Sequence, residues 1–547
     1  DGREIPCFGL TGPRAGSDAT SLPDTGVVCK QTINGEEVLG LRLNFEKRWI
    51  TLAPIATVVG LAFRLFDPEK LLGDEEDRGI TLALIPRDTD GMEIGRRHHP
   101  IGSPLDTIIG GPDMIGQGWR MLVECLSIGR CITLPSGATG TARYALGWSG
   151  GFTRVRRQFN VPVAEMEGVQ EPLARMAALA YISQATVYQT ANMIDHGEKP
   201  AVPSAILKSQ LTEFQRVLLS DAMDVHGGKA VTLGPRNYLG IGYSANPVAI
   251  TVEGANIMTR NLMIFGQGAI RCHPYVLEEL AAKDANDMQA FDKAFFGHAG
   301  LIFGNAARAF TLGFGIGKAS VPFDGPATAY AQDIARLSAG FGLCADAAMA
   351  SLGSALKKRE MISARLGDVL SNLYLASMVL KQWQAGSKVE GEEALLHYSC
   401  RFLLQRAEQA FVEIFDNLHA VVMPTGRRWN KPHDDLARDI AKRISTHSAL
   451  RSKLLENTWD ADDGEQRNPL ARYNALLVDY DRAEAIYRTL NKAYAKGELP
   501  QTALHPEARV EAGLEKGLIS EEDAAFMRTF EAEVLEMLTV DDFAYDA

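Results

Sequence analysis

Hydrophobic residues in the first 110 positions recur in short runs that Gly, Pro and Asp interrupt, a pattern typical of β-strands. Two of these runs, residues 27–33 and 38–45, flank Asn34 and Gly35, a dipeptide that favours a type I′ hairpin turn. Further apolar runs cover residues 49–66 and 80–85. We therefore expect a β-domain, in the form of a barrel or sandwich, over residues 1–112.

From about residue 115 the apolar spacing changes to the three- and four-residue intervals of a helix. We expect a four-helix bundle over residues 113–270, with one helix that Pro172 opens and another whose apolar face consists of Leu207, Leu211, Phe214 and Leu218. Similar stripes predict a long all-α C-terminal extension over residues 271–547, which makes the fold class α+β. These stripes consist of Leu366, Leu370, Leu373 and Leu380; of Leu396, Leu403, Ala407, Ala410 and Ile414; and of Leu436, Ile440 and Ile444.

The composition is that of a soluble globular protein of several domains, with 547 residues, 46% hydrophobic and 23% charged. A net charge of −12, without a basic patch that aromatic residues interrupt, argues against a nucleic-acid partner. The seven cysteines have no paired spacing, which favours reduced thiols over a disulfide framework or a zinc site.

Nothing in the sequence predicts a signal peptide or a membrane span. The longest apolar stretch, residues 49–63, contains Pro54 and is too short to cross a bilayer. The chain begins at Asp1, without Met, close to an expected strand. We therefore expect that a segment precedes it.

Three familiar motifs fail on closer inspection. Residues 240–245 match GxGxxA by letter, but Pro247 follows too soon for a dinucleotide-binding helix and no βαβ unit is expected there. Residues 313–319 resemble a phosphate loop, but Ala319 replaces the required Ser or Thr, so we expect a helix end. The sequence also lacks the GxSxG elbow of a serine hydrolase.

One carboxylate, Glu253, stands in an almost uncharged run over residues 249–260, with Gly254 directly after it and Arg260 seven residues further on. Dry surroundings disfavour the charged form of a carboxylate and raise its pKa, which suits a general base that works near neutral pH. The alternative is structural, because Glu beside Gly can also begin a helix.

Two segments near the N-terminus could contact a cofactor. In residues 7–18 a Gly/Pro turn places backbone N–H groups and the hydroxyls of Thr11 and Ser17 where they could face a phosphate. In residues 47–51, Trp49 and Thr51 share one face of a strand and could cover a planar ring and hydrogen-bond its edge. The alternatives are a plain connection between strands and an ordinary half-buried strand.

In their order and spacing, these segments resemble the acyl-CoA dehydrogenase family over roughly residues 5–270. Residues 156–159 are similar to the family's RxxF turn, which reaches the FAD of the partner subunit, and residues 226–228 to its loop over the adenine. Within this family, the amino-acid sequence most resembles the large bacterial fatty-acyl-CoA dehydrogenases of β-oxidation. The family's N-terminal helical domain is not visible in this sequence.

The resemblance implies an FAD-dependent enzyme that desaturates medium- or long-chain fatty acyl-CoA to trans-2-enoyl-CoA, and it implies no metal. It makes Glu253 the catalytic base. The implied substrate contacts are Ser17, Arg130 and Gly254. The implied FAD contacts are Phe8, Leu10, Thr11, Ser17, Trp49, Thr51, Arg156, Gln158, Gly227 and Gly228. The sequence departs from the family near the adenine and CoA contacts, at Ser127, Asn160, Asp224, Ala255 and Ile257.

Other functions remain open on the same fold. An acyl-CoA oxidase would pass its electrons to oxygen, and a non-catalytic acyl-CoA-binding protein would hold no FAD. The implied partners of a dehydrogenase are an electron-transfer flavoprotein and a second copy of the chain in a homodimer. We expect a cytoplasmic protein, in which the C-terminal extension could make a peripheral contact with the inner membrane.

Overall fold

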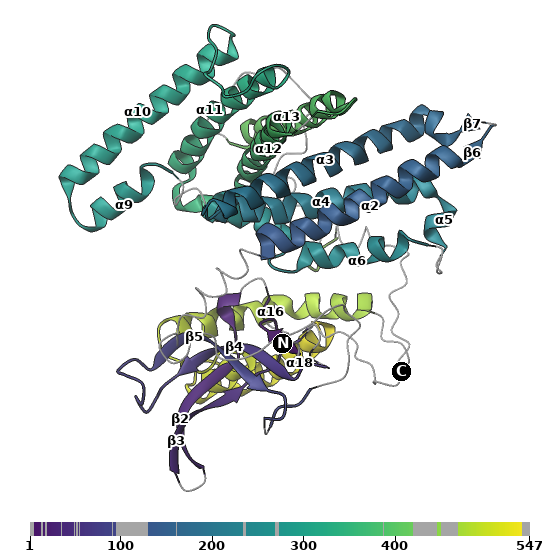
Figure 1. Ribbon diagram of the computed structural model, residues 1–547. Helices are drawn as coiled ribbons and strands as arrows, with labels where there is room; N and C mark the ends of the chain where they lie inside the picture. The colour runs from purple at the N-terminus through teal and green to yellow at the C-terminus, as the bar shows by residue number, and fades with distance from the viewer. Residues whose placement is uncertain are drawn as a thin grey trace. The chain divides into compact units, whose positions relative to one another are not determined.

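The computed structural model describes residues 5–12, 15–16, 19–33, 36–48, 50, 53, 55–89, 91–94, 129–159, 161–232, 237–267, 273–386, 388–418, 446–449 and 469–538. The chain divides by its internal contacts into two compact units. One unit combines residues 1–123 with residues 435–547, and the other consists of residues 124–434 (Figure 1).

A mixed five-stranded sheet forms the first part of the chain (Figure 1). Its strands are β1 (Pro6–Gly9), β2 (Thr25–Ile33), β3 (Glu36–Asn44), β4 (Val58–Phe66) and β5 (Asp77–Pro86), with a short 3₁₀ helix, η1 (Ala19–Ser21), before β2. Strand β4 is central, because β5 pairs antiparallel along one edge while β1 and β2 pair parallel with different halves of the other. This explains why β4 is hydrophobic nearly throughout, with Leu61, Phe63 and Leu65 fully buried.

The predicted hairpin is confirmed. Strands β2 and β3 pair antiparallel, and the last pair of the ladder joins Ile33 to Glu36. This register leaves only Asn34 and Gly35 to connect the strands, and both lie outside the described residues. The expected strand at residues 80–85 is confirmed as part of β5.

Three helices near the C-terminus share a small apolar core. They are α16 (Pro469–Ala495), α17 (Pro506–Glu515) and α18 (Glu521–Leu538). Leu490, Val510 and Met527, one from each helix, are buried in this core. The expected stripe over residues 436–444 lies outside the described residues.

The second unit begins with a helical bundle built on α2, α3 and α4 (Figure 1). Its elements are the π-helix η3 (Gly129–Thr133), α2 (Leu134–Val155), β6 (Arg157–Gln158), β7 (Val161–Pro162), η4 (Val163–Glu165), α3 (Glu167–Asp195), α4 (Ala201–His226), α5 (Gly228–Val231), α6 (Gly240–Thr251), α7 (Asn256–Met258) and a second π-helix, η5 (Thr259–Gln267). The apolar face predicted for α4 is confirmed, since Leu207, Leu211, Phe214 and Leu218 are all buried.

The expectation about Pro172 in this unit is wrong. Pro172 does not open α3, which begins at Glu167 and contains Pro172 in its second turn. Residues 240–245 do not form a turn between a strand and a helix, because they are the first half of α6, which begins at Gly240, contains Pro247 and ends at Thr251. A proline removes one N–H donor from a helix, and here the remaining hydrogen bonds and packing against α4 outweigh that loss.

The first part of the extension belongs to this unit and continues the same hydrophobic core. Its elements are α9 (Val276–Asp284), α10 (Met288–Gly313), α11 (Ala327–Leu352), η6 (Gly353–Lys358), α12 (Glu360–Ala385) and α13 (Glu392–Asn417). Helix α12 packs against α3 and η5, and the predicted stripes of α12 and α13 are buried there. The helix end predicted for residues 313–319 is confirmed, because α10 ends at Gly313.

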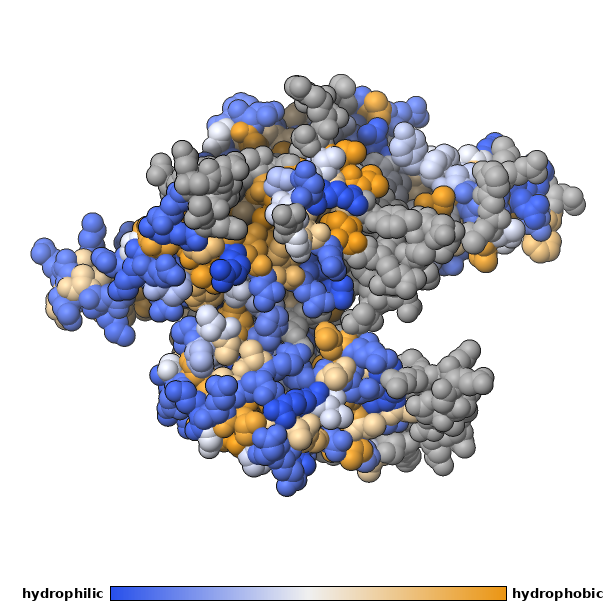
Figure 2. Space-filling model, turned by 90° about the horizontal axis from the view of Figure 1, so that it is seen from below, coloured by the Kyte–Doolittle hydropathy of each residue, from blue (hydrophilic) through white to orange (hydrophobic). Residues whose placement is uncertain are grey.

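None of the described helices is both long and apolar enough to cross a bilayer. The face shown in Figure 2 carries both apolar and polar side chains among the coloured residues. Among the described residues, Cys7, Cys29, Cys131, Cys344 and Cys400 form no disulfide bonds.

Candidate active site

Glu253 lies in the loop between α6 and α7, and not at the start of a helix. Its φ of 52° and the φ of 92° at Gly254 put two successive residues in the left-handed region. A glycine adopts this conformation freely, whereas a glutamate there costs on the order of 1 kcal/mol or more. Contacts around the loop must therefore hold Glu253 in place.

The Glu253 carboxylate is closely enclosed. Its Oε2 atom is buried and has no hydrogen-bond partner among the described residues. A Cβ atom added to Gly129 would lie only 2.6 Å from Oε2 and 2.7 Å from Oε1, so the absence of a side chain at Gly129 makes room for the carboxylate. Burial raises the pKa of Glu253, while the nearby cations Arg130 and Lys208 act in the opposite direction.

Arg130, predicted to bind substrate, lies beside this loop. It follows Gly129 in the π-helix η3, and its Nε donates a hydrogen bond of 2.6 Å to the backbone oxygen of Glu253. Burial lowers the pKa of the Arg130 guanidinium, and the Glu253 charge opposes that change. The structure thus brings together two predicted site residues that are 123 positions apart.

Lys208, which the sequence reasoning missed, supports the loop from the other side. Its Nζ donates to the backbone oxygens of Ile250 at 3.0 Å and Gly254 at 2.9 Å, and to Oδ1 of Asn256 at 2.8 Å. Its sequence position gave no signal, because a lysine beside the apolar face of a helix usually packs its stem on that face and keeps its charge in water.

Asn256 connects the same loop to α4 through side-chain hydrogen bonds. Its Nδ2 donates to the Thr212 hydroxyl and to Oε1 of Glu213, each at 2.9 Å. Because Asn256 also accepts from Lys208, one buried polar group joins three positions of α4 to the residues that follow Gly254.

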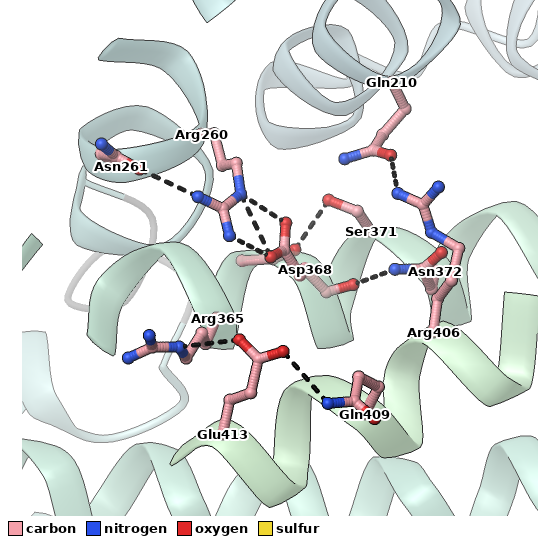
Figure 3. Close-up of polar contacts among 11 residues, drawn as sticks. Gln210, Arg260, Asn261, Arg365, Asp368, Ser371, Asn372, Arg406, Gln409 and Glu413 are labelled. Carbon is pink, nitrogen blue, oxygen red and sulfur yellow. Dashed lines mark hydrogen bonds and ion pairs between the residues drawn. The ribbon is translucent and has the colours of Figure 1, made fainter. Parts of the chain in front are cut away.

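Arg260 points toward the extension rather than toward Glu253. Its Nε donates to Oδ1 of Asp368 on α12 at 2.9 Å (Figure 3). Beside this pair, Arg365 donates to Glu413 of α13 at 3.1 Å. The ion pair of Arg260 with Asp368 therefore attaches the segment after the loop to the extension.

The predicted FAD contacts within the bundle are accessible. Arg156 and Gln158 lie at the β6–β7 hairpin after α2, and both are exposed. Phe159 next to them is 90% exposed and has a φ of 50°. Gly227 and Gly228 connect α4 to α5, and a Cβ atom at either position would meet open space.

The predicted FAD contacts in the sheet that the structure describes lie at the end of β1 and directly after it. Phe8 is 40% exposed although its neighbour Cys7 is buried. Leu10 and Thr11 follow, and their backbone oxygens accept hydrogen bonds from Lys47 Nζ at 2.9 Å and Arg48 N at 3.1 Å. These bonds hold the segment that leads into residue 49 beside residues 10 and 11.

Ser17, Trp49 and Thr51 lie outside the described residues. Glu253 belongs to the other compact unit. The predicted approach of Trp49 and Thr51 to Glu253 across a flavin therefore stays a prediction.

A second polar cluster contains His273, His298 and Asp346, whose ligand atoms lie within 4.8 Å of one another. The Nδ1 of His273 accepts backbone N–H groups of Tyr275 and Val276, so the neutral ring carries its proton on Nε2. That N–H faces Oδ1 of Asp346 at 3.1 Å. Hydrogen bonds that join the start of α9 to α11 account for this cluster, because a metal would need the lone pair at Nε2.

Family models of acyl-CoA dehydrogenases match almost the whole chain. The middle domain matches residues 7–107, the C-terminal domain residues 116–264, and the bacterial-type C-terminal region residues 270–543. The chain belongs to the acyl-CoA dehydrogenase family, whose members bind FAD.

Individual relatives are more distant or shorter. The probable acyl-CoA dehydrogenase YngJ of Bacillus subtilis (strain 168) is 30% identical over 245 residues, which are 42% of this chain and 59% of that protein. A protein named HemX from Proteus mirabilis is 54% identical over 98 residues, 15% of this chain and 58% of its own length. The chain thus spans less than two thirds of these curated relatives.

A solved structure shares the fold. The acyl-CoA dehydrogenase of Bacillus anthracis, complexed with FAD, superposes with a TM-score of 0.59 at 20% identity, over 80% of this chain and 75% of that one.

The residues present fit an FAD. The candidate contacts Phe8, Arg156 and Gln158 are exposed, and Gly227 and Gly228 leave the backbone open to close approach. The buried, unpartnered oxygen of Glu253 adds a base of raised pKa, which suits the reaction of this family.

Proposed function

We propose that this protein desaturates medium- or long-chain fatty acyl-CoA between the α- and β-carbons, as the first oxidation of β-oxidation. The observation that carries the proposal is the Glu253 carboxylate, which is enclosed over Gly129 on a strained loop and leaves Oε2 without a partner among the described residues. An unpartnered, desolvated carboxylate is the group that such a reaction needs as its base.

Glu253 would remove a proton from the α-carbon of the thioester. Its raised pKa makes it a stronger base than an exposed glutamate, because desolvation disfavours the charged form. The α-proton becomes acidic only when the thioester oxygen is polarised, and the backbone N–H of Glu253 is the candidate donor in this loop. Arg130 would keep that backbone in place through its bond to the Glu253 oxygen.

FAD, when bound, supplies the acceptor for the hydride that leaves the β-carbon. Phe8, Leu10 and Thr11 would bind it from the sheet, together with Ser17, Trp49 and Thr51. Gly227 and Gly228 would allow the backbone to approach its adenine half. Arg156 and Gln158 would reach the FAD of a second copy, a role that the 90% exposure of Phe159 at the same hairpin supports.

The test replaces Glu253 by Gln in the flavin-loaded protein, with palmitoyl-CoA added anaerobically while the flavin absorbance is followed. Glu253→Gln should retain bound flavin and bleach at least about a thousandfold more slowly than the wild type, because the base is lost. The matched control is Glu198→Gln, an exposed glutamate between α3 and α4. Bleaching of Glu253→Gln at the wild-type rate would refute the assignment.

The electron acceptor distinguishes a dehydrogenase from an oxidase on the same fold. We propose an electron-transfer flavoprotein as the acceptor. Turnover that needs this partner and releases no hydrogen peroxide in air supports a dehydrogenase. Peroxide release in the absence of the partner would favour the acyl-CoA oxidase alternative.

A further inference from the structure

Lys208 is a buried cation to which the mechanism above assigns no part. It is 0% exposed, although it lies on α4 beside a row of apolar side chains. An ammonium group has three N–H donors, and at Lys208 all three meet acceptors at 3.0 Å or less. Every one of these acceptors belongs to residues 250–256.

We infer that Lys208 is a positioning residue, which holds the Glu253 loop in its left-handed conformation and whose charge sets the pH range in which Glu253 acts as a base. The inference rests on the proposed function, since it concerns how the same base is held and tuned.

The geometry of the three bonds supports the positioning role. The Ile250 oxygen precedes Glu253 in the chain, while the Gly254 oxygen and the Asn256 side chain follow it. Lys208 therefore binds the loop both before and after Glu253. Relaxation of the left-handed φ at Glu253 would turn the neighbouring carbonyls away from Nζ. Charge-assisted hydrogen bonds of this kind are the stronger ones in proteins, which is the stabilisation that a strained glutamate requires.

The charges around Lys208 support the tuning role. The charged groups that face it are Glu253 on the loop, Arg130 on η3 and Glu213 on α4 itself. Burial, with the help of Arg130, lowers the pKa of Lys208 to about 8, and the two glutamates oppose that change. Lys208 therefore remains charged at neutral pH, where its charge and that of Arg130 stabilise the carboxylate of Glu253.

The sign of the effect on Glu253 follows directly. Burial raises the pKa of this carboxylate, and the Lys208 charge holds the rise in check. Without that charge the pKa of Glu253 would rise further, so a larger fraction of the base would be protonated at a given acidic pH. The acid limb of the rate profile should then move to higher pH.

The experiment measures flavin bleaching by palmitoyl-CoA against pH in the flavin-loaded wild type, Lys208→Met, Lys208→Gln and Lys208→Arg. Met removes the charge and the donors, Gln keeps two N–H donors without charge, and Arg keeps the charge. In Lys208→Met and Lys208→Gln the acid limb of the rate profile should shift to higher pH by about one unit. In Lys208→Arg it should stay at the wild-type position. Should Lys208→Met not fold, the comparison of Gln with Arg carries the test.

Gln210→Met is the matched control. Gln210 lies on the same helix and is also buried, but its side-chain oxygen accepts a hydrogen bond from Arg406 of α13, whereas Lys208 donates to residues 250–256 (Figure 3). Its acid limb should coincide with that of the wild type. An unshifted limb in both neutral variants, or an equal shift in Lys208→Arg, would overturn the inference.

The two proposals fail differently. If the flavin-loaded wild type is not bleached by any acyl-CoA, the proposed function is wrong. If the wild type is bleached, Glu253→Gln is not, and the neutral Lys208 variants keep the wild-type limb, the inference alone is wrong.

Discussion

Because Gly129 lies against the Glu253 carboxylate, the substitution Gly129→Ala tests whether Glu253 works from the position that the structure shows. The three atoms nearest to a Cβ built on Gly129 are Oε2, Oε1 and Cδ of Glu253, at 2.6, 2.7 and 2.9 Å. Ordinary contacts of such a Cβ lie beyond about 3.4 Å. In Gly129→Ala the Glu253 carboxylate must therefore move by close to an ångström.

The expected effects on activity and on stability differ. A displacement of about 1 Å in a reacting group lowers a rate on the order of a hundredfold, or about 2.7 kcal/mol of transition-state free energy. The atoms that must move are the end of the flexible Glu253 side chain, so the substitution should lower the free energy of unfolding only slightly. Alanine also favours a helical segment over glycine by up to about 1 kcal/mol. Gly129→Ala should thus unfold at or above the wild-type temperature.

The assay combines single-turnover bleaching of the flavin with thermal unfolding of the same preparation. Gly137→Ala is the matched control, because Gly137 lies in α2 and a Cβ there would meet nothing within 4 Å. It should gain similar stability and keep the wild-type rate. A wild-type rate in Gly129→Ala would show that the carboxylate does not work from this position.

Two further predictions concern the cofactor and the extension. Arg156→Ala should lose FAD on gel filtration several times faster than Arg154→Ala, an exposed arginine two residues earlier, because only Arg156 is expected to reach the partner's FAD; equal flavin content in both variants would contradict this role. Asp368→Asn should lower the free energy of unfolding by about 1 kcal/mol in urea titrations, since it weakens the half-exposed pair with Arg260, and an unchanged midpoint would show that the pair does not attach the extension.

Periodicity in the sequence was sufficient for the elements that bury a regular face. Helix α4 and helix α13 lie where their apolar stripes predicted them, because burial of every third or fourth residue selects one helix orientation. The β2–β3 hairpin followed from the turn preference of the dipeptide Asn34–Gly35, which is a property of adjacent residues. Proline was a poorer guide, since Pro172 and Pro247 lie inside helices whose packing outweighs one missing donor.

The site was only half visible in the sequence because its parts come from distant segments. The uncharged run around Glu253 correctly indicated a carboxylate of raised pKa. The two cations that restrain that rise, Arg130 and Lys208, lie 123 and 45 residues before it, and no local pattern joins them to it. Arg260, the only cation of the run itself, instead binds Asp368 of the extension.

The placement of Arg130 and Lys208 beside the Glu253 loop determines how the pKa of the base is set. A carboxylate in a purely apolar pocket would have so high a pKa that it would be protonated at neutral pH and could not accept a proton. A carboxylate in direct contact with a cation would be ionised but too weak a base. In this protein Arg130 and Lys208 donate their hydrogen bonds to the backbone and side-chain oxygens around Glu253, and none of those bonds is to its carboxylate. The cations therefore act on the base only through space, which opposes the rise in the pKa of Glu253 and leaves Oε2 without a hydrogen bond from either cation.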